Sequence, residues 1–279
     1  ICSIDTCTAN NFNYSTPAGV DDTAIVITCS LSGNTPETVA ATKLAVEKGA
    51  HVVAVTHKAD SALAQNGQYQ IIHGFYESYG AKMEKPARVL ELACEILNEY
   101  EGYEHYDDMQ DGLSKIFDLI NDSCKLFRST AKKFAEDHYN APILYVMSSG
   151  ATQKVAYSFS ICLLMEMQWI NASVIHSGEF FHGPFEITDK NGAFFLLVAD
   201  GRTRKADERA ITFLKKYAGE KVYILDAKEL GLDNLKDSVS EYFNHLLFTP
   251  ILNNVYMKAL SEATGIDYTT RRYMWKVEY

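Results

Sequence analysis

Apolar residues along the chain occur in two patterns: short continuous runs, and stretches in which they recur every three or four positions. The first run, residues 23–29 (TAIVITC), is continuous, which is typical of a strand buried on both faces of a sheet. From Pro36 to Gly49 the spacing is helical, and residues 51–57 (HVVAVTH) form a second continuous run. The pattern predicts a β-loop-α-β unit with parallel strands.

The same order of elements returns in the second half of the chain. Residues 143–147 form a predicted strand, residues 148–152 form a loop of small residues, and helical spacing then continues to about Trp169. The elements predicted after this helix are a strand, a helix and a strand at residues 193–200, 205–217 and 221–227.

Helical patterns separate the two halves. A short strand is predicted at residues 69–72, and amphipathic helices follow over residues 78–137, interrupted by the acidic, tyrosine-rich segment EGYEHYDD. We therefore interpret the chain as two related α/β halves joined by helices. The predicted segments are a first domain, linking helices, a second domain, and a C-terminal helix with its tail, at residues 1–77, 78–138, 139–245 and 246–279.

Composition narrows the class of protein. The 279 residues include 36 acidic and 26 basic ones, and the formal net charge of -10 argues against nucleic acid as a partner. No apolar run approaches the length that spans a membrane, and no basic-then-apolar leader opens the chain. The six cysteines lack the paired CxxC spacing of a zinc site, so we expect reduced thiols in a cytoplasmic protein.

The loop after the first predicted strand concentrates small polar groups ahead of a helix. Ser30, Ser32 and Thr35 offer hydroxyls, Gly33 lets the backbone approach a ligand closely, and the helix start presents its N–H groups. These features favour a phosphate. The alternative is an ordinary helix start in which Thr35 is the N-cap, and the residue types alone do not decide between the two interpretations.

Three segments resemble a known family. The loop segment CSLSGNTPETV resembles the phosphate loop of the sugar isomerase (SIS) domain. The segment LLMEMQWINASVIHSGEFFHGPFEI resembles one shared by the isomerase half of glucosamine-6-phosphate synthase and its relatives. Within this superfamily, SGEFFHGPFEI and the ending RRYMWKVEY are most similar to the fructosamine-6-phosphate deglycases, such as fructoselysine-6-phosphate deglycase. The resemblance covers essentially the whole chain and implies two SIS-type domains of the flavodoxin-like, three-layer, parallel-sheet kind.

The beginning of the chain departs from the family pattern. Family members begin with another strand and with a loop rich in Gly, Cys and Ser that helps to hold the sugar phosphate. This chain begins at Ile1 almost directly with strand-like residues, and its first full strand is the one that follows in the family. We therefore expect that the first domain lacks its N-terminal strand, because the chain is a piece of a longer product or because its site is incomplete.

The resemblance assigns functions to particular residues. It places the sugar phosphate on Ser30, on the backbone of Leu31, and on Ser32 and Thr35. It implies a catalytic glutamate at Glu166 and a ring-opening histidine at His182. The further candidates for substrate contacts are Ser148, Ser149, Glu179 and Lys276.

Two of these further candidates have alternative roles. Glu179 is either a substitute acid or a residue that orients its loop. Lys276 lies near the position at which the synthase uses a lysine to form a Schiff base with the ketose, a role that a deglycase does not require.

The two proposed catalytic residues also have ordinary interpretations. Glu166 lies among apolar residues on a predicted helix, and a carboxylate there is rarely structural unless it is paired, because burying an unpaired charge is costly. His182 precedes Gly-Pro in a loop, where a histidine by itself more often bonds to backbone carbonyls; only the resemblance favours catalysis. The remaining histidines have no spacing typical of metal ligands.

The resemblance implies an enzyme without a metal or cofactor that converts a fructosamine 6-phosphate and water to glucose 6-phosphate and a free amine. The alternatives are an aldose-ketose isomerase, a synthase without its glutaminase half, and a non-catalytic sugar-phosphate sensor. The expected partners are a small sugar phosphate and a second copy of the chain, because the family forms symmetric dimers with shared active sites. The aromatic and basic C-terminal tail is expected to lie over the site.

Overall fold

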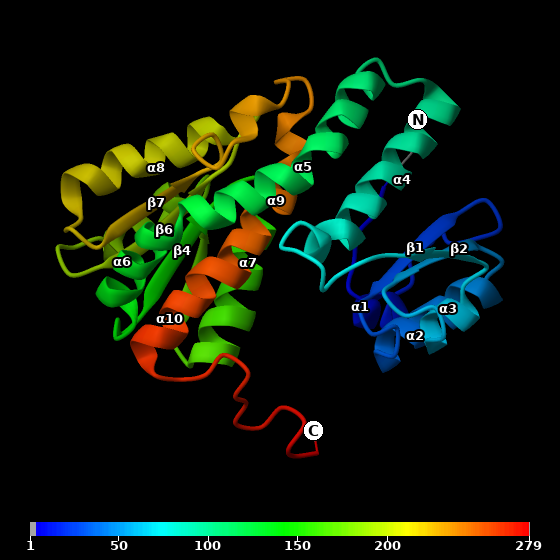
Figure 1. Cartoon of the computed structure of the whole chain (residues 1–279), viewed down its shortest axis with the longest axis horizontal. Coiled ribbons are helices and arrows are strands. Elements are labelled where there is room, and N and C mark those ends of the chain that lie inside the picture. Colours follow the sequence, from blue (N-terminus) through cyan, green and yellow to red (C-terminus); the bar gives the residue numbers. More distant parts are fainter. Residues whose placement is uncertain (1–3, 279) are drawn as a thin grey trace. The chain divides into compact units, whose positions relative to one another are not determined.

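A computed structural model describes residues 4–278, and the chain divides into two compact units, Ile1–Tyr106 and Asp107–Tyr279 (Figure 1). Among the six cysteines predicted to be reduced, Cys2 lies outside the described residues, and the other five are free thiols. The division of the chain into four segments remains a prediction.

Unit 1 contains a three-stranded parallel sheet in the order β1-β2-β3. The continuous apolar runs form the strands that they predict, and Ser30 at the end of β1 pairs with Thr56 at the end of β2. Helix α2 packs against β1 and β2, and α4 contacts β2. The elements are α1 (Ala9–Tyr14), β1 (Ile25–Ser30), α2 (Pro36–Glu47), β2 (His51–Thr56), α3 (Ala62–Asn66), β3 (Tyr69–Ile72) and α4 (Glu84–Glu101).

The strand-like start expected for the chain is wrong for the residues that precede β1. They form helix α1, whose start is capped because the Thr8 hydroxyl accepts the N–H of Asn11 at 3.2 Å. Phe12 is buried and packs with Ala41 and Ala45 of α2. Burial of Phe12 and the cap at Thr8 therefore favour a helix here, although the apolar pattern is weak.

The predicted linking helices are α4, α5 (Tyr106–Leu126) and α6 (Arg128–His138). Helix α4 ends at Gly102, whose φ of 72° is in the left-handed region that favours glycine. The acidic segment therefore forms the break between α4 and α5, as its composition predicts.

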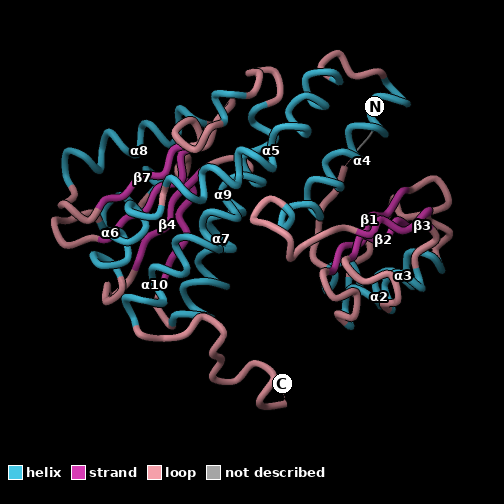
Figure 2. Tube along the Cα trace, in the orientation of Figure 1, coloured by secondary structure: helices cyan, strands magenta, loops and turns pink. Residues whose placement is uncertain are grey.

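Unit 2 contains a four-stranded parallel sheet in the order β5-β4-β6-β7, with α8 on one side and α7 on the other (Figures 1 and 2). The first strand, β4, pairs with both β5 and β6, so the chain winds outward in both directions from β4. The regular elements are β4 (Leu144–Ser148), α7 (Thr152–Ser158), β5 (Ala172–His176), β6 (Ala193–Val198), α8 (Arg204–Tyr217), β7 (Val222–Asp226), α9 (Asn244–Ile251) and α10 (Met257–Thr264). Two parallel α/β sheets confirm the predicted fold class.

The helix expected to run to Trp169 differs from its prediction in two ways. After α7 it continues as a π-helix, Phe159–Met167, and it ends at Met167. Trp169 then takes a φ of 56°, a left-handed conformation that is strained for a bulky residue. Wide helical turns and backbone strain of this kind often occur at functional sites.

One part of the unit 2 core is an aromatic cluster around Phe134 of α6. Its ring lies 4.5 Å from Phe195 of β6 and 5.1 Å from Tyr256, measured between centroids, and it stacks on His138 at 4.7 Å. Phe134, Phe195 and Tyr256 are fully buried. Burial also lowers the pKa of His138, whose ring nitrogens face two backbone carbonyl oxygens.

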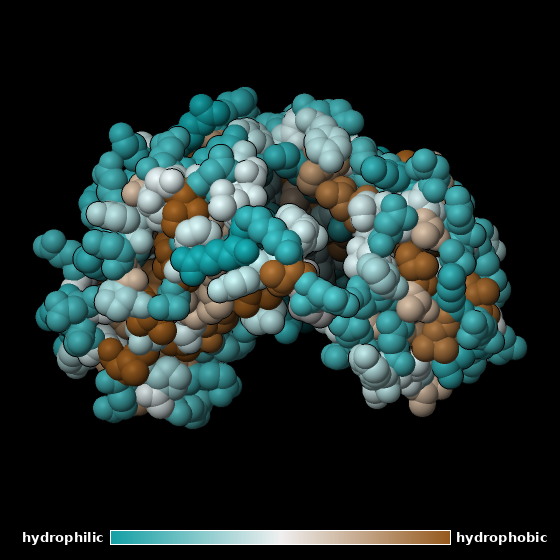
Figure 3. All heavy atoms as spheres, turned by 90° about the horizontal axis from the view of Figure 1, so that it is seen from below, coloured by the Kyte–Doolittle hydropathy of each residue, from teal (hydrophilic) through white to brown (hydrophobic). Residues whose placement is uncertain are grey.

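Among the described residues, no helix combines the length and the apolar character needed to cross a membrane. The face of the molecule in Figure 3 is mostly hydrophilic, with apolar atoms exposed in scattered groups.

We predict that Phe134→Ala lowers the free energy of unfolding by about 3–5 kcal/mol, because it leaves a cavity among packed rings. Leu126→Ala is the matched control, since that side chain is 70% exposed, and its effect is expected within about 0.5 kcal/mol. Urea unfolding of the two variants measures the difference. Equal effects would contradict the central position of Phe134.

Candidate functional site

The predicted phosphate loop joins β1 to α2 in unit 1, and its hydroxyls bond to one another. The Ser30 hydroxyl accepts the N–H of Gly33 at 3.1 Å and lies 2.9 Å from the Thr35 hydroxyl oxygen. The Ser32 hydroxyl accepts the N–H of Asn34 at 3.2 Å. Ser30 is buried, whereas Ser32 and Thr35 are exposed. The loop therefore has one buried serine that anchors it and two exposed hydroxyl residues.

Gly33 holds the loop against the start of α3. Its φ is +67°, and a Cβ at this position would lie 2.0 Å from the Ser61 hydroxyl oxygen and 2.7 Å from that of Thr56. The carbonyl of Gly33 accepts the N–H of Leu63 at 2.8 Å. Only glycine fits both the backbone angle and the space, so the loop is fixed by its neighbours before any ligand binds.

The start of α2 presents unpaired backbone donors. Thr35 occupies the N-cap position, as predicted, but its side chain makes no capping bond, and its hydroxyl lies beside Ser30 instead. The first-turn N–H groups of a helix have no acceptor within the helix, and the helix dipole makes this end positive. Together with the accessible hydroxyls, this geometry suits an anion such as a phosphate.

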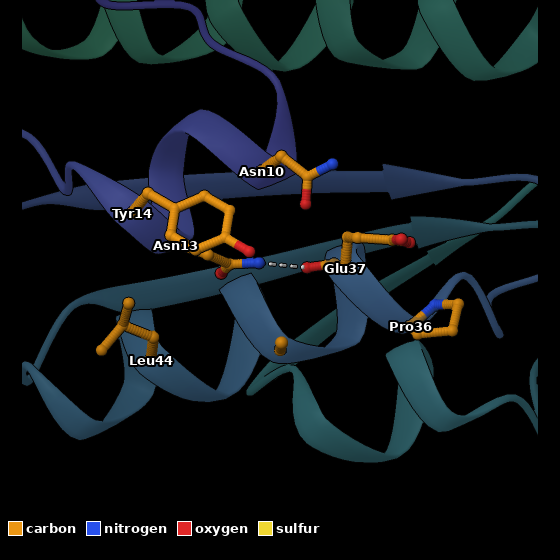
Figure 4. A pocket seen from close by; sticks show the side chains of 7 residues that line it. Asn10, Asn13, Tyr14, Pro36, Glu37 and Leu44 are labelled. Carbon is orange, nitrogen blue, oxygen red and sulfur yellow. Dashed lines mark hydrogen bonds between the residues drawn. The ribbon is translucent and has the colours of Figure 1, made fainter. Parts of the chain in front are cut away.

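A groove of about 480 Å³ between α1 and α2 is a separate feature of unit 1 (Figure 4). The Asn13 amide donates to the carbonyl of Glu37 at 3.0 Å and spans the two helices there. The lining residues are Asn10, Asn13, Tyr14, Pro36, Glu37, Ala40 and Leu44. None of these is a hydroxyl residue of the phosphate loop, so the groove is not the predicted phosphate site.

In unit 2, Glu166 forms an ion pair with the C-terminal tail. The Nε atom of Arg271 lies 2.7 Å from Oε1 of Glu166, and the side chains of Arg271 and Glu166 are only 10% and 24% exposed, respectively. Arg271 also donates from Nη1 to the carbonyls of Tyr268 and Thr270, at 2.8 and 3.0 Å. The carboxylate on an apolar helix therefore has the partner that its burial requires.

The surroundings of Glu166 carry further contacts with the tail. Cys162 precedes Glu166 on the same π-helix, and the pKa of its thiol is raised, first by burial and then by the Glu166 charge. The Arg272 guanidinium lies 3.7 Å over the ring of Trp169, a cation–π contact. Lys276 donates from Nζ to the carbonyl of Arg271. The beginning of the tail thus packs on the segment that carries Glu166.

His182 is exposed, at the end of a 3-10 turn, Phe180–His182, that follows β5. Its backbone N–H donates to the carbonyl of Glu179 at 2.9 Å, and Glu179 is exposed as well. Phe180 is fully buried and anchors the turn, while Gly183, with a φ of 136°, redirects the chain after it. His182 is therefore accessible and its backbone is firmly placed.

The segments that carry Glu166 and His182 pack on opposite faces of the unit 2 sheet within one chain. The π-helix of Glu166 packs through Phe159 against Phe195 of β6, at 5.8 Å between centroids. The turn of His182 packs through Phe180 into the cluster that contains Phe194 and α8. Phe194 and Phe195 are consecutive strand residues and point to opposite faces, so these two segments belong to opposite layers of one copy.

Ser148, the last residue of β4, and Ser149, which begins the loop after it, are two candidates for substrate contacts, and both are fully buried. The Ser148 hydroxyl donates to the carbonyl of Leu197 at 2.7 Å, and the Ser149 hydroxyl donates to that of Thr203 at 3.1 Å. Their hydroxyls tie this loop to its neighbours, and a substrate role for them remains a prediction.

Sequence reasoning missed three residues of this neighbourhood. Asp207 of α8 is a fully buried carboxylate that accepts the N–H of Ala199 at 3.1 Å, and burial raises its pKa. Arg271 and Trp169 contact Glu166 and the tail, respectively. Of the three, only Arg271 had a signal in the sequence, the basic and aromatic composition of the tail; Asp207 and Trp169 lie outside the tail. Within residues 4–278, no group of three or more His, Cys, Asp or Glu residues is placed to hold a metal ion.

Comparison with known proteins identifies the family. The SIS domain model matches residues 8–74, which include the phosphate loop. Fructosamine deglycase FrlB of Bacillus subtilis is 40% identical over 275 residues, covering 99% of this chain and 83% of the relative. The chain belongs to the sugar isomerase (SIS) domain family. The predicted resemblance to this family and its deglycases is confirmed.

Two further comparisons also cover most of this chain. A structure from Salmonella typhimurium LT2, described as a candidate phosphosugar isomerase, has a TM-score of 0.90 and 41% identity, covering 98% of this chain and 83% of that one. Fructoselysine 6-phosphate deglycase of Escherichia coli K12 is 26% identical over 223 residues, covering 79% of this chain and 64% of the relative.

We predict that Gly33→Ala destabilises unit 1 by about 1–3 kcal/mol more than Gly102→Ala does, because overpacking adds to backbone strain. Both glycines have positive φ, at 67° and 72°, but nothing lies within 4 Å of the Cβ position at Gly102. The control therefore measures the strain alone. Urea unfolding that gives the same loss for both variants would show that the loop is not braced by Ser61.

Proposed function

We propose that this chain is a phosphosugar deglycase that converts a fructosamine 6-phosphate and water to glucose 6-phosphate and a free amine. The observation that carries the proposal is the mostly buried, ion-paired Glu166 in a chain that is 40% identical to a fructosamine deglycase. A carboxylate held in this way is suited to moving a carbon-bound proton, because it is oriented and partly shielded from water.

In this proposal the substrate phosphate binds to the loop after β1. The hydroxyls of Ser30, Ser32 and Thr35 and the backbone N–H groups of Leu31 and the α2 start contact it, and Ser30 also holds the loop in shape through Gly33. Binding through a phosphate remote from the reacting carbons allows the binding energy to orient the substrate.

His182 opens the sugar ring. A histidine exchanges protons near neutral pH, so it transfers a proton from the anomeric hydroxyl to the ring oxygen, and the ring C–O bond breaks to give the open-chain ketone at C2. Its exposed position at the end of a fixed turn supports this role.

Glu166 then takes a proton from C1, which carries the amine, and the electron pair of that C–H bond forms a C1–C2 double bond. The C2 carbonyl electron pair moves to its oxygen, which takes up a proton from solvent, and the product is an enaminol. Return of a proton to C2 and loss of the proton on nitrogen give an aldimine. Water adds to its C=N bond, which breaks to release the amine and glucose 6-phosphate. The reaction written in this way uses no metal and no cofactor.

We further propose that the working assembly is a homodimer in which Glu166 of one copy and His182 of the other serve one substrate. The support is the sheet that separates the segments of these residues within a copy. A symmetric pair would form two such sites.

We predict that Glu166→Gln keeps substrate binding and lowers turnover roughly 100-fold or more, because the amide keeps the shape but removes the base. His182→Asn is expected to be slow on the cyclic substrate only. Deuterium incorporation at C1 of an open-chain fructosamine phosphate, read by mass spectrometry, separates the roles. Exchange should vanish in the Glu166 variant and persist in the His182 variant.

Either of two results would contradict this division of roles. Full exchange with Gln at position 166 would place the base elsewhere, with Glu179 the first alternative. Loss of exchange in both variants would mean that Glu166 and His182 act as one unit.

We predict that the inactive variants Glu166→Gln and His182→Asn regain activity when they are co-expressed. In a random mixture half of the dimers are mixed, and each mixed dimer has one intact site, so about a quarter of wild-type activity is expected. Separately purified variants that have not exchanged subunits are the control. If both residues of one copy served the same site, the mixture would stay inactive.

A further inference from the structure

The tail reaches Glu166 from far along the chain and is fastened beside it at two adjacent residues. Arg271 is 105 positions from Glu166 and pairs with its Oε1 atom at 2.7 Å. Arg272 lies over Trp169, three residues beyond Glu166. These contacts are made on the segment where the helix is π-wound and the backbone of Trp169 is strained.

We infer that Arg271 is a positioning residue for the reaction: it orients the Glu166 carboxylate and leaves Oε2 as the atom that accepts the C1 proton. This inference rests on the proposed function. Arg271 occupies Oε1, whereas Oε2 makes no hydrogen bond or ion pair with the residues that the structure describes. The two carboxylate oxygens of Glu166 therefore differ: Oε1 is bonded to Arg271, and Oε2 is left to accept a proton.

The arginine itself has little freedom, which is what a positioning role requires. Its Nη1 atom donates to the carbonyls of Tyr268 and Thr270, and its side chain is only 10% exposed. A planar guanidinium fixed at both Nε and Nη1 defines a direction, which a flexible ammonium does not. Because the cation comes from the tail, the base is oriented only while the beginning of the tail is docked.

The kinetic test compares Arg271→Ala, Arg271→Lys and the control Arg202→Ala on a fructosamine 6-phosphate. Arg202 forms a 2.7 Å ion pair with Glu241 and is 81% exposed, so the control removes a pair of equal length elsewhere. Arg271→Ala should lower kcat roughly 10- to 100-fold with KM changed little, because a misplaced base affects the chemical step. Arg271→Lys should restore part of kcat, and the control should match the wild type.

Two further experiments, guanidinium rescue and a double variant, show whether Arg271 acts through Glu166. Guanidinium ion added to Arg271→Ala should raise kcat and leave Arg271→Lys unchanged. In the Glu166→Gln background, Arg271→Ala should cause no further loss, since the group that it orients is gone. Multiplicative losses, a rise in KM at constant kcat, or an unchanged kcat in Arg271→Ala would overturn the inference.

Limited proteolysis, which does not depend on catalysis, tests whether the Glu166–Arg271 ion pair holds the tail on unit 2. Trypsin should cleave after Arg271 faster in Glu166→Ala than in wild type, and Glu241→Ala should show no such increase. Equal cleavage in Glu166→Ala and wild type would overturn the claim that the ion pair holds the tail. If the wild type were inactive with every fructosamine 6-phosphate, the proposed function would be overturned. If the wild type were active and Arg271→Ala had the same kcat, only this inference would be overturned.

Discussion

Burial of one charge decides where the C-terminal tail packs on unit 2. Glu166 lies on a helix whose neighbours are apolar, and an unpaired carboxylate there would be costly. The compensating cation is Arg271, so the chain must return after α10 to the helix that follows β4. The same pairing places the beginning of the tail and orders the carboxylate, and the stacking of Arg272 on Trp169 is a second contact beside it.

The doubly wound sheet adds a second constraint, one of geometry. A parallel strand such as β6 is buried on both sides, so Phe194 and Phe195 belong to different packing layers. Elements that follow β4 and β5 in the chain fall on different layers as well. The core therefore lies between the segments of Glu166 and His182, although these residues are close in sequence. Closeness in sequence does not show that two residues share a site.

Patterning predicted most of the fold because strands buried on both faces carry continuous apolar runs, as β2 and β6 do. Strand β5 was missed because it is an edge strand that mixes small and polar residues, and an apolar pattern is weak there. In the two candidate regions, one in each unit, the chemistry of Ser30 and Thr35 and the apolar surroundings of Glu166 were readable from the sequence. Arg271 was not, because residue spacing carries no information on which distant cation meets a carboxylate.

The chain has two tryptophans, and both take left-handed backbone angles beside the tail arginines. Trp169 carries Arg272 on its ring, and the Arg271 guanidinium lies 5.7 Å from the ring centroid of Trp275 within the tail. The fluorescence of an indole depends on nearby charges and on its exposure to water. The two tryptophans are therefore intrinsic fluorescent reporters of the contact between the tail and the segment that carries Glu166. Undocking of the tail would alter the surroundings of both indoles, and the light emitted would report that event without an added label.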